Sequence, residues 1–407
     1  MSETLGRPAW LTAARTAAVF DALEAAGGPG CARFVGGCVR NALLGRKVDD
    51  LDIATPLTPD MVTAALRAAR LKAVPTGVEH GTVTAISGGK PYEITTLRRD
   101  VETDGRRAVV AFTDDWGEDA ARRDFTLNAL YADRDGTVFD PLGSGEADAH
   151  AGRIVFVGDA ATRIREDYLR ILRFFRFTAW YGRGVPDAAA VAACAALKDG
   201  LGRLAAERVS KELLKLLAAA DPRAAVALMA ETGVMAEVLP EAAGLARSEA
   251  LAALGVRDPE LRLAALLPDD PAVAAAAARR LRLSNDLRDR LVAAADGAVP
   301  LDAEMTAAEA RRALYALGAR TVADRAWLGA AADPTAAAGW RRLAALAHDW
   351  RKPKFPLSGA DVAALGVRRG PRVGALLREA EAWWVENDFP DDRLALLARL
   401  RAAAEAR

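Results

Sequence analysis

The sequence has few cysteines and histidines and no long apolar segment. Its 407 residues include three cysteines, Cys31, Cys38 and Cys194, which form no C-x-x-C spacing and leave an odd count. This pattern favours a reducing cytoplasm. With only three histidines, no histidine–aspartate phosphohydrolase site is expected. No apolar run approaches the roughly 20 residues that cross a bilayer, and no secretory signal opens the chain, so we predict no membrane segment.

A net charge is also absent. The 55 basic residues balance the 55 acidic ones, which argues against a protein that merely coats nucleic acid. Hydrophobic residues make up 52% of the chain and charged residues 27%, as in soluble globular proteins. The length predicts two or more packing units.

The first third of the chain mixes short β-type runs with helices, and the remainder is helical. A helix signal follows Thr58, which can cap a helix that has Pro59 at its first position. From about residue 160 the pattern is helical to the end, with breaks at prolines 186, 222, 240, 268, 300 and 334. The predicted strands are 32–35, 51–54, 82–86, 92–96 and 137–139. We therefore expect one α/β unit followed by a helical extension.

Two aspartates at the start of the second predicted strand suggest a metal site. Asp50 and Asp52 are two residues apart, so on a strand their carboxylates would point to the same side. Two such anions repel each other unless a cation lies between them. Mg²⁺ is the natural candidate, because it binds one or two carboxylates together with phosphate oxygens of a substrate.

A glycine pair precedes this strand and predicts a phosphate site. Gly36 and Gly37 form a turn at the start of a helix that carries Arg40, where phosphate oxygens fit well. Taken alone, the pair is equally typical of a tight strand-to-helix turn. Together with the aspartates it indicates a site for a triphosphate and its metal ion. For Glu93 two interpretations stay open: a third carboxylate that activates the attacking hydroxyl, or an exposed strand residue.

A second constellation lies in residues 166–177. Three arginines and one aspartate recur there at every third position, which predicts one polar ridge along a helix; they are Asp167, Arg170, Arg173 and Arg176. Cytosine and adenine both present an amine beside an unprotonated ring nitrogen. An Asp-x-x-Arg pair can accept from that amine and donate to that nitrogen, so it admits C and A and rejects U and G. The simpler alternative is an ion pair within the helix, without a ligand.

Two further basic patches have less specific patterns. Arg122 and Arg123 precede a β-type run, and Arg123 is expected to reach a triphosphate or ribose. Arg208, Lys211 and Lys215 share one face of a later helix. That face either meets an RNA backbone or is simply solvated.

These motifs resemble a known family. The combination G-G-x-V-R, D-x-D, R-R-D-F-T-x-N-A-L and E-D-x-x-R-x-x-R-x-x-R-F resembles the class II tRNA nucleotidyltransferases and bacterial poly(A) polymerases. The resemblance implies an α+β fold, with a polymerase-beta-like nucleotidyltransferase head that has a mixed sheet, followed by an all-helical neck, body and tail. The expected boundaries are 1–155 for the head, 156–240 for the neck, and 241–407 for a body and tail that bind tRNA.

The resemblance also implies roles for individual residues. It makes Asp50 and Asp52 the catalytic ligands of Mg²⁺, and Asp167 with Arg170 the pair that reads the base. The other residues expected to bind the incoming CTP or ATP are Gly36, Gly37, Arg40, Arg123, Arg173 and Arg176. Residues 100–116 resemble the mobile loop used in switching from C to A. One departure is Asn41, where an Asp is usual, and this change is expected to weaken a contact that supports the glycine turn.

The predicted function is addition of C and A to the 3′ end of tRNA by a two-metal mechanism with release of pyrophosphate. A poly(A) polymerase is the nearest alternative, and a non-catalytic RNA-binding or nucleotide-sensing module is a more distant one. Partial enzymes that add only CC or only A also remain open. The sequence leaves protein partners unknown.

Overall fold

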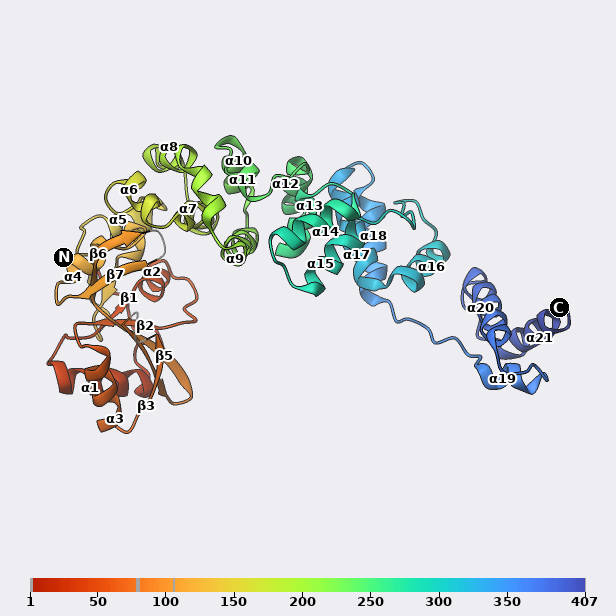
Figure 1. Ribbon diagram of the computed structural model, residues 1–407, viewed down its shortest axis with the longest axis horizontal. Helices are drawn as coiled ribbons and strands as arrows, with labels where there is room; N and C mark the ends of the chain where they lie inside the picture. The colour runs from red at the N-terminus through yellow and green to blue at the C-terminus, as the bar shows by residue number, and fades with distance from the viewer. Residues whose placement is uncertain (1–2, 78–80, 105–106, 407) are drawn as a thin grey trace. The chain divides into compact units, whose positions relative to one another are not determined.

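The computed structural model describes residues 3–77, 81–104 and 107–406. The chain divides into two compact units, Met1–Pro240 and Glu241–Arg407 (Figure 1). The boundary predicted at residue 155, between a head and a neck, stays a prediction. None of the described helices is both long and apolar enough to cross a membrane.

The first unit is built on a mixed sheet. Within the described residues the sheet has seven strands in the order β3-β4-β5-β2-β1-β8-β9. Its strands are β1 (Arg33–Val35), β2 (Asp52–Thr55), β3 (Lys72–Gly77), β4 (Thr82–Ser87), β5 (Lys90–Thr96), β8 (Tyr131–Ala132) and β9 (Val138–Phe139). Among these described strands only β2 and β5 pair in parallel. The mixed sheet of the predicted α+β fold is therefore confirmed, and the five predicted strands all lie in it.

The helices of the first unit include a long N-terminal one that the sequence reading did not identify. They are α1 (Ala14–Gly27), α2 (Gly37–Leu43), α3 (Pro59–Ala68), α4 (Trp116–Ala121), α5 (Gly145–Ala151), α6 (Ala160–Glu166), α7 (Leu169–Tyr181), α8 (Ala188–Ala196), α9 (Ala206–Leu217), α10 (Arg223–Glu231) and α11 (Val234–Val238), with 3₁₀ turns η2 (Thr126–Asn128) and η3 (Lys198–Arg203). Helix α3 begins as predicted, because the Thr58 side chain accepts a hydrogen bond from the backbone N–H of Met61.

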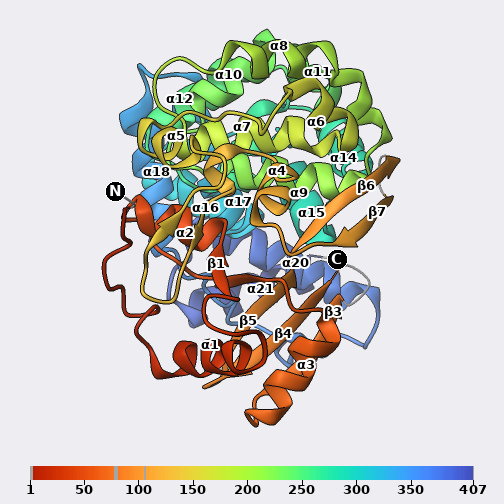
Figure 2. The ribbon, with the colours of Figure 1, turned by 90° about the vertical axis from the view of Figure 1, so that its left-hand side faces the viewer.

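Helices α1 and α3 pack side by side against strands β3 to β5 (Figure 2). Their apolar faces are fully buried, with Val19, Phe20 and Leu23 from α1 and Leu66 from α3. Phe20 contacts Phe34 of β1, with ring centroids 4.6 Å apart. This core covers one face of the sheet and so supports the position of β2.

The segment 100–116, predicted as a loop, is largely a hairpin. Strands β6 (Arg98–Asp104) and β7 (Arg107–Phe112) pair with each other in a separate two-stranded sheet. Helix α4 then starts at Trp116, where Asp115 caps it. Gly105 and Arg106, quoted for the resemblance, lie outside the described residues. The hairpin gives the form of this segment, and its expected mobility and role in switching from C to A stay predictions.

The second unit is entirely helical in its described residues. Its helices are α12 (Leu245–Ala253), α13 (Pro259–Leu266), α14 (Pro271–Arg280), α15 (Asn285–Ala295), α16 (Ala307–Leu317), α17 (Ala319–Ala332), α18 (Ala337–Asp349), α19 (Gly359–Ala364), α20 (Pro371–Glu386) and α21 (Arg393–Glu405). One core joins α16, α17 and α18 around Leu314 and Val322. Another joins the last three helices around Val362 and Trp384. The predicted proline breaks all fall between helices.

Candidate active site

The two aspartates of the predicted metal site lie at the start of β2. The strand begins at Asp52 itself, so Asp50 precedes it. The sequence reading had treated both aspartates as strand residues. Asp50 is exposed and Asp52 is half-buried. Burial, reinforced by the charges of Glu93 and Asp50, raises the pKa of Asp52 to about 6, and Arg123 opposes that rise. Asp52 is therefore an anion under repulsion, and a cation would relieve it.

Glu93 lies beside this pair. Strands β2 and β5 run parallel with Asp52 opposite Glu93, and the Glu93 backbone N–H donates to the Leu51 carbonyl at 3.2 Å. The Glu93 side chain is exposed at the same sheet edge. Among the described residues no three His, Cys, Asp or Glu side chains form a cluster that could hold a metal ion. This geometry suits an ion that takes two carboxylates and completes its shell with substrate oxygens.

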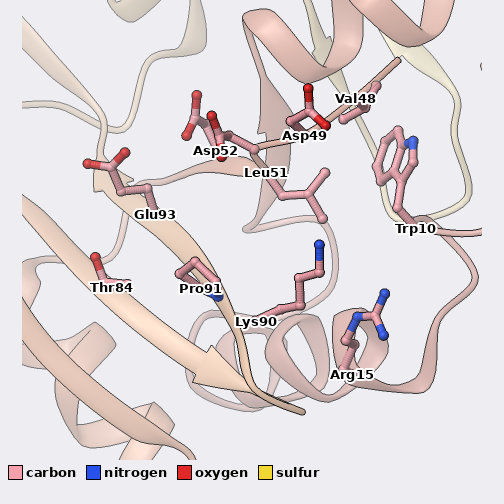
Figure 3. Close-up of a pocket in the computed structure, with 11 residues that line it drawn as sticks. Trp10, Arg15, Val48, Asp49, Leu51, Asp52, Thr84, Lys90, Pro91 and Glu93 are labelled. Atoms are coloured by element: carbon pink, nitrogen blue, oxygen red, sulfur yellow. The ribbon is translucent and has the colours of Figure 1, made fainter. Parts of the chain in front are cut away.

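The carboxylates line a cavity of about 330 Å³ (Figure 3). Asp52 and Glu93 lie at one end of it. Trp10, Arg15 and Lys90 lie at the other end, and their side chains face the same space.

The glycine turn lies directly beside an arginine. Gly36 has φ +69° and ψ −117°, a conformation that only glycine adopts readily, and it precedes α2 as predicted. A Cβ on Gly36 would lie 3.5 Å from Nη1 of Arg123. Because Arg123 also lowers the pKa of Asp52 through its charge, this guanidinium connects the turn with the carboxylate pair.

Arg123 is held by a buried carboxylate that the sequence reading did not identify. Its Nη2 donates to Asp119 at 2.9 Å, and its Nε donates to the Tyr131 hydroxyl at 3.2 Å. Asp119 also accepts from Arg122 and from Tyr131. Although burial raises the pKa of Asp119, the charges of Arg123 and Arg122 lower it to about 2. Arg123 thus remains charged and fixed. Contrary to the sequence reading, it precedes the 3₁₀ turn η2 rather than a strand.

Arg40 points into the protein and is only 7% exposed. Its Nη2 donates to Tyr181 at 2.8 Å and to Asn41 at 3.0 Å, and its Nη1 donates to Asn128. The Oδ1 atom of Asn41 also accepts from the Tyr181 hydroxyl at 3.0 Å. Asn41 therefore supplies the acceptor oxygen that an Asp would supply there, without its charge.

Three predicted arginines surround one aromatic ring. The guanidinium carbons of Arg40, Arg173 and Arg176 lie 5.1, 5.4 and 4.3 Å from the ring centroid of Phe177. Arg40 comes from α2, whereas the other three residues belong to α7. Residues of two distant sequence motifs are thus brought together in the first unit, and their role in nucleotide binding stays a prediction.

Buried carboxylates anchor the arginines of α7. Asp124 accepts from Nε of Arg173 at 2.7 Å and from Asn128 at 3.0 Å. Glu212 of α9 accepts from Nε of Arg176 at 2.6 Å. Asp124 stands inside the quoted R-R-D-F-T motif, so a carboxylate beside two arginines was a usable signal. Glu212 gave no comparable signal, because its partner lies 36 residues away.

Asp167 does not belong to the helical ridge. Helix α7 begins at Leu169, and Asp167 lies between α6 and α7 in an extended conformation. Its Oδ2 accepts from Arg208 of α9 at 2.8 Å, whereas Arg170 pairs with Glu166. The predicted ridge was therefore wrong for Asp167, because the chain turns at the junction of two helices. The simpler alternative, an Asp167–Arg170 ion pair, was wrong as well.

Comparisons with known proteins identify the family. The model of the Poly A polymerase head domain matches residues 32–155, and that of the probable RNA and SrmB-binding site of polymerase A matches residues 186–245. The mitochondrial CCA tRNA nucleotidyltransferase 1 of Mus musculus is 32% identical over 397 residues, which cover 91% of this chain and 86% of the relative. The chain belongs to the class II CCA tRNA nucleotidyltransferase and poly(A) polymerase family.

Bacterial members of the family are also similar. The CCA-adding enzyme of Geobacillus thermodenitrificans is 41% identical over 207 residues, which cover 50% of this chain and 49% of the relative. The crystal structure of the Bacillus stearothermophilus CCA-adding enzyme in complex with CTP superimposes with a TM-score of 0.77 at 28% identity. That match covers 98% of this chain and 100% of the other. The nucleotidyltransferase fold is therefore shared along the chain.

Proposed function

We propose that this enzyme adds C and A nucleotides to the 3′ end of tRNA, using CTP and ATP and releasing pyrophosphate. The observation that carries the proposal is the position of Arg123. Its guanidinium lies beside the Gly36 turn and couples electrostatically to Asp52. A triphosphate at the turn would thus lie next to the carboxylates that direct the attacking hydroxyl.

Mg²⁺ fits the carboxylates at this site. Asp50 and Asp52 are the proposed ligands, because their mutual repulsion and that of Glu93 favour a cation. When bound, the metal promotes ionisation of the 3′ hydroxyl and neutralises the triphosphate. Glu93 faces the same space as Asp52 and is the proposed acceptor of the hydroxyl proton.

The remaining predicted residues are proposed to hold the nucleotide. Gly36 and Gly37 admit the phosphates, and Arg123, Arg173 and Arg176 neutralise them. Arg40 is committed to protein partners, so we propose that it acts by fixing Asn128 and the turn.

Base selection is assigned to Asp167 and Arg170. Both now hold protein partners, Arg208 and Glu166. A pairing edge of cytosine or adenine must therefore replace these ion pairs. Uracil and guanine cannot accept from Arg170 and donate to Asp167 in that arrangement. Their binding therefore provides too little free energy to displace the two ion pairs.

The test is nucleotide addition to a tRNA that lacks its last three nucleotides. The acceptor is incubated with CTP, with ATP and with both, and the new 3′ ends are sequenced. We expect C-C from CTP alone and C-C-A from both. Addition of CC only or A only would identify a partial enzyme, unlimited A would identify a poly(A) polymerase, and no addition would refute the enzyme.

The compartment is also proposed rather than established. Cys31, Cys38 and Cys194 are all buried and unpaired, which supports the cytoplasmic location expected from the sequence.

A further inference from the structure

Part of the wall of the carboxylate cavity lies outside the proposed reaction centre and has no role in binding the incoming nucleotide. This wall consists of Trp10, Arg15 and Lys90 (Figure 3). They come from the segment before α1, from α1 and from the first residue of β5. Neither the glycine turn nor any arginine of α7 lines this cavity. Within this cavity the carboxylates share the space with Arg15 and Lys90. The cation beside the glycine turn that acts on Asp52 is Arg123, between α4 and η2, and it does not line the cavity.

In-line displacement at phosphorus requires such a two-sided arrangement. The attacking oxygen and the leaving pyrophosphate lie on opposite sides of the transferred phosphorus. If the triphosphate occupies the side of Gly36 and Arg123, the 3′ hydroxyl must approach from the other side of the carboxylates. We propose that the cavity formed with Trp10, Arg15 and Lys90 binds the 3′-terminal nucleotide of the RNA acceptor, an inference that rests on the proposed function.

The two cations are available for a ligand. Arg15 and Lys90 are exposed. Neither side chain has an ion-pair or hydrogen-bond partner within the part of the chain that the structure describes. Figure 3 shows the Lys90 ammonium pointing into the cavity and Arg15 beside it. Free cations close to carboxylates suit the phosphate of a single-stranded RNA end, which lies one linkage away from the reacting hydroxyl.

The aromatic part of the wall is held firmly in place. The Thr16 hydroxyl donates to the Trp10 carbonyl at 2.7 Å and lies 2.9 Å from the Tyr92 hydroxyl. The Trp10 ring packs edge-on against Phe34, with centroids 4.9 Å apart, and remains half-exposed toward the cavity. An indole fixed in this way offers a stacking surface for an unpaired base. A cavity of about 330 Å³ has room for one nucleotide.

The principal test removes both cations in the full-length enzyme. The variant R15A/K90A is compared with R67A/K72A, which removes two exposed and equally unpaired charges elsewhere in the first unit. Addition of A is measured on tRNA that ends in CC. We expect kcat/KM for tRNA to fall about 10- to 100-fold in R15A/K90A and less than about twofold in the control. The Kd for ATP without RNA should remain unchanged, because the triphosphate lies on the other side.

Two further measurements separate a phosphate contact from a general charge effect. The slope of log kcat/KM against log salt concentration should decrease in magnitude by about 0.7 for each lost contact. A tRNA with a neutral methylphosphonate at its last linkage should impair the wild-type enzyme and give no additional loss in R15A/K90A. Full additivity of the two losses, or an equal loss in R67A/K72A, would overturn the inference.

The stacking surface is tested with W10A and W10F. We expect W10A to lower kcat/KM for tRNA severalfold and W10F to recover most of it, with thermal unfolding used to confirm that both variants fold. Equal losses in both folded variants would contradict stacking. If the wild-type enzyme adds A normally and R15A/K90A matches it, the inference fails and the proposed function stands. If the wild-type enzyme adds no nucleotide, the proposed function itself fails.

Discussion

Replacement of Asp52 by Asn should stabilise the metal-free protein while it abolishes nucleotide transfer. Burial of Asp52, together with the charges of Glu93 and Asp50, raises its pKa from 3.8 to about 6. The folded state therefore binds a proton that the unfolded chain releases near pH 4. Stability consequently falls as the pH rises from about 4 to about 6, and it stays lower above that range.

The expected gain follows from that pKa. Each unit of pKa corresponds to about 1.4 kcal/mol, so burial of the charge and its repulsion by Glu93 and Asp50 together cost at most about 3 kcal/mol, and partial solvent screening reduces this cost to about 1–3 kcal/mol. In D52N this cost disappears at pH 7.5, and the difference from wild type should shrink as the pH falls toward 5.

Urea unfolding in EDTA measures this difference. The matched control is D49N, because Asp49 lines the same cavity but is exposed and paired with Lys47, so its loss should change stability by less than about 0.5 kcal/mol. Added Mg²⁺ should stabilise the wild type more than D52N. A D52N protein that is less stable than wild type at pH 7.5 would refute the proposed cost of the buried, repelled charge.

Three other substitutions test the residues that hold Arg40, Arg173 and the glycine turn in place. Burial raises the pKa of Asp124, but Arg173 and Asn128 lower it below its ordinary value. The free energy of unfolding of D124N, measured with urea at neutral pH, should therefore be about 2–4 kcal/mol lower than that of the wild type. This difference should narrow below about pH 4, as the wild-type carboxylate protonates. A difference that does not change with pH would contradict the ion pair. N41A removes one of the three side-chain acceptors of Arg40 and should cost about 2 kcal/mol in the same assay. An unchanged unfolding midpoint would show that the bond contributes nothing to stability. G36A forces a side chain into a conformation that only glycine adopts readily, so it should lower the free energy of unfolding by about 1–3 kcal/mol. It should also weaken CTP binding measured by calorimetry. Unchanged CTP binding would show that the triphosphate does not bind at this turn.

Local patterns were sufficient for the framework of the fold. The Thr58-Pro59 start of α3 was predicted from capping chemistry alone, because the interactions lie within one helical turn. Strands β2 and β5 were predicted from β-branched and aromatic runs. Their parallel pairing, which places Glu93 opposite Asp52, depends on contacts 41 residues apart and could only be suspected.

The partners of the site residues were less predictable. The sequence identified the arginines of α7 but not Glu212, which binds Arg176 across the interface between α7 and α9. The spacing of three residues wrongly extended α7 back to Asp167, because a periodic pattern continues across a sharp junction between helices. Arg208, left open as an RNA contact or a solvated residue, instead pairs with Asp167.

The central claim is that one centre unites the carboxylates of β2 with a nucleotide at the Gly36 turn. It is tested most directly by a crystal structure of the enzyme with CTP and Mn²⁺, in which the anomalous signal locates the metal. We predict a peak shared by Asp50, Asp52 and the triphosphate, with the phosphates beside Arg123. A triphosphate bound away from the Gly36 turn, or a metal peak that contacts neither aspartate, would contradict the account.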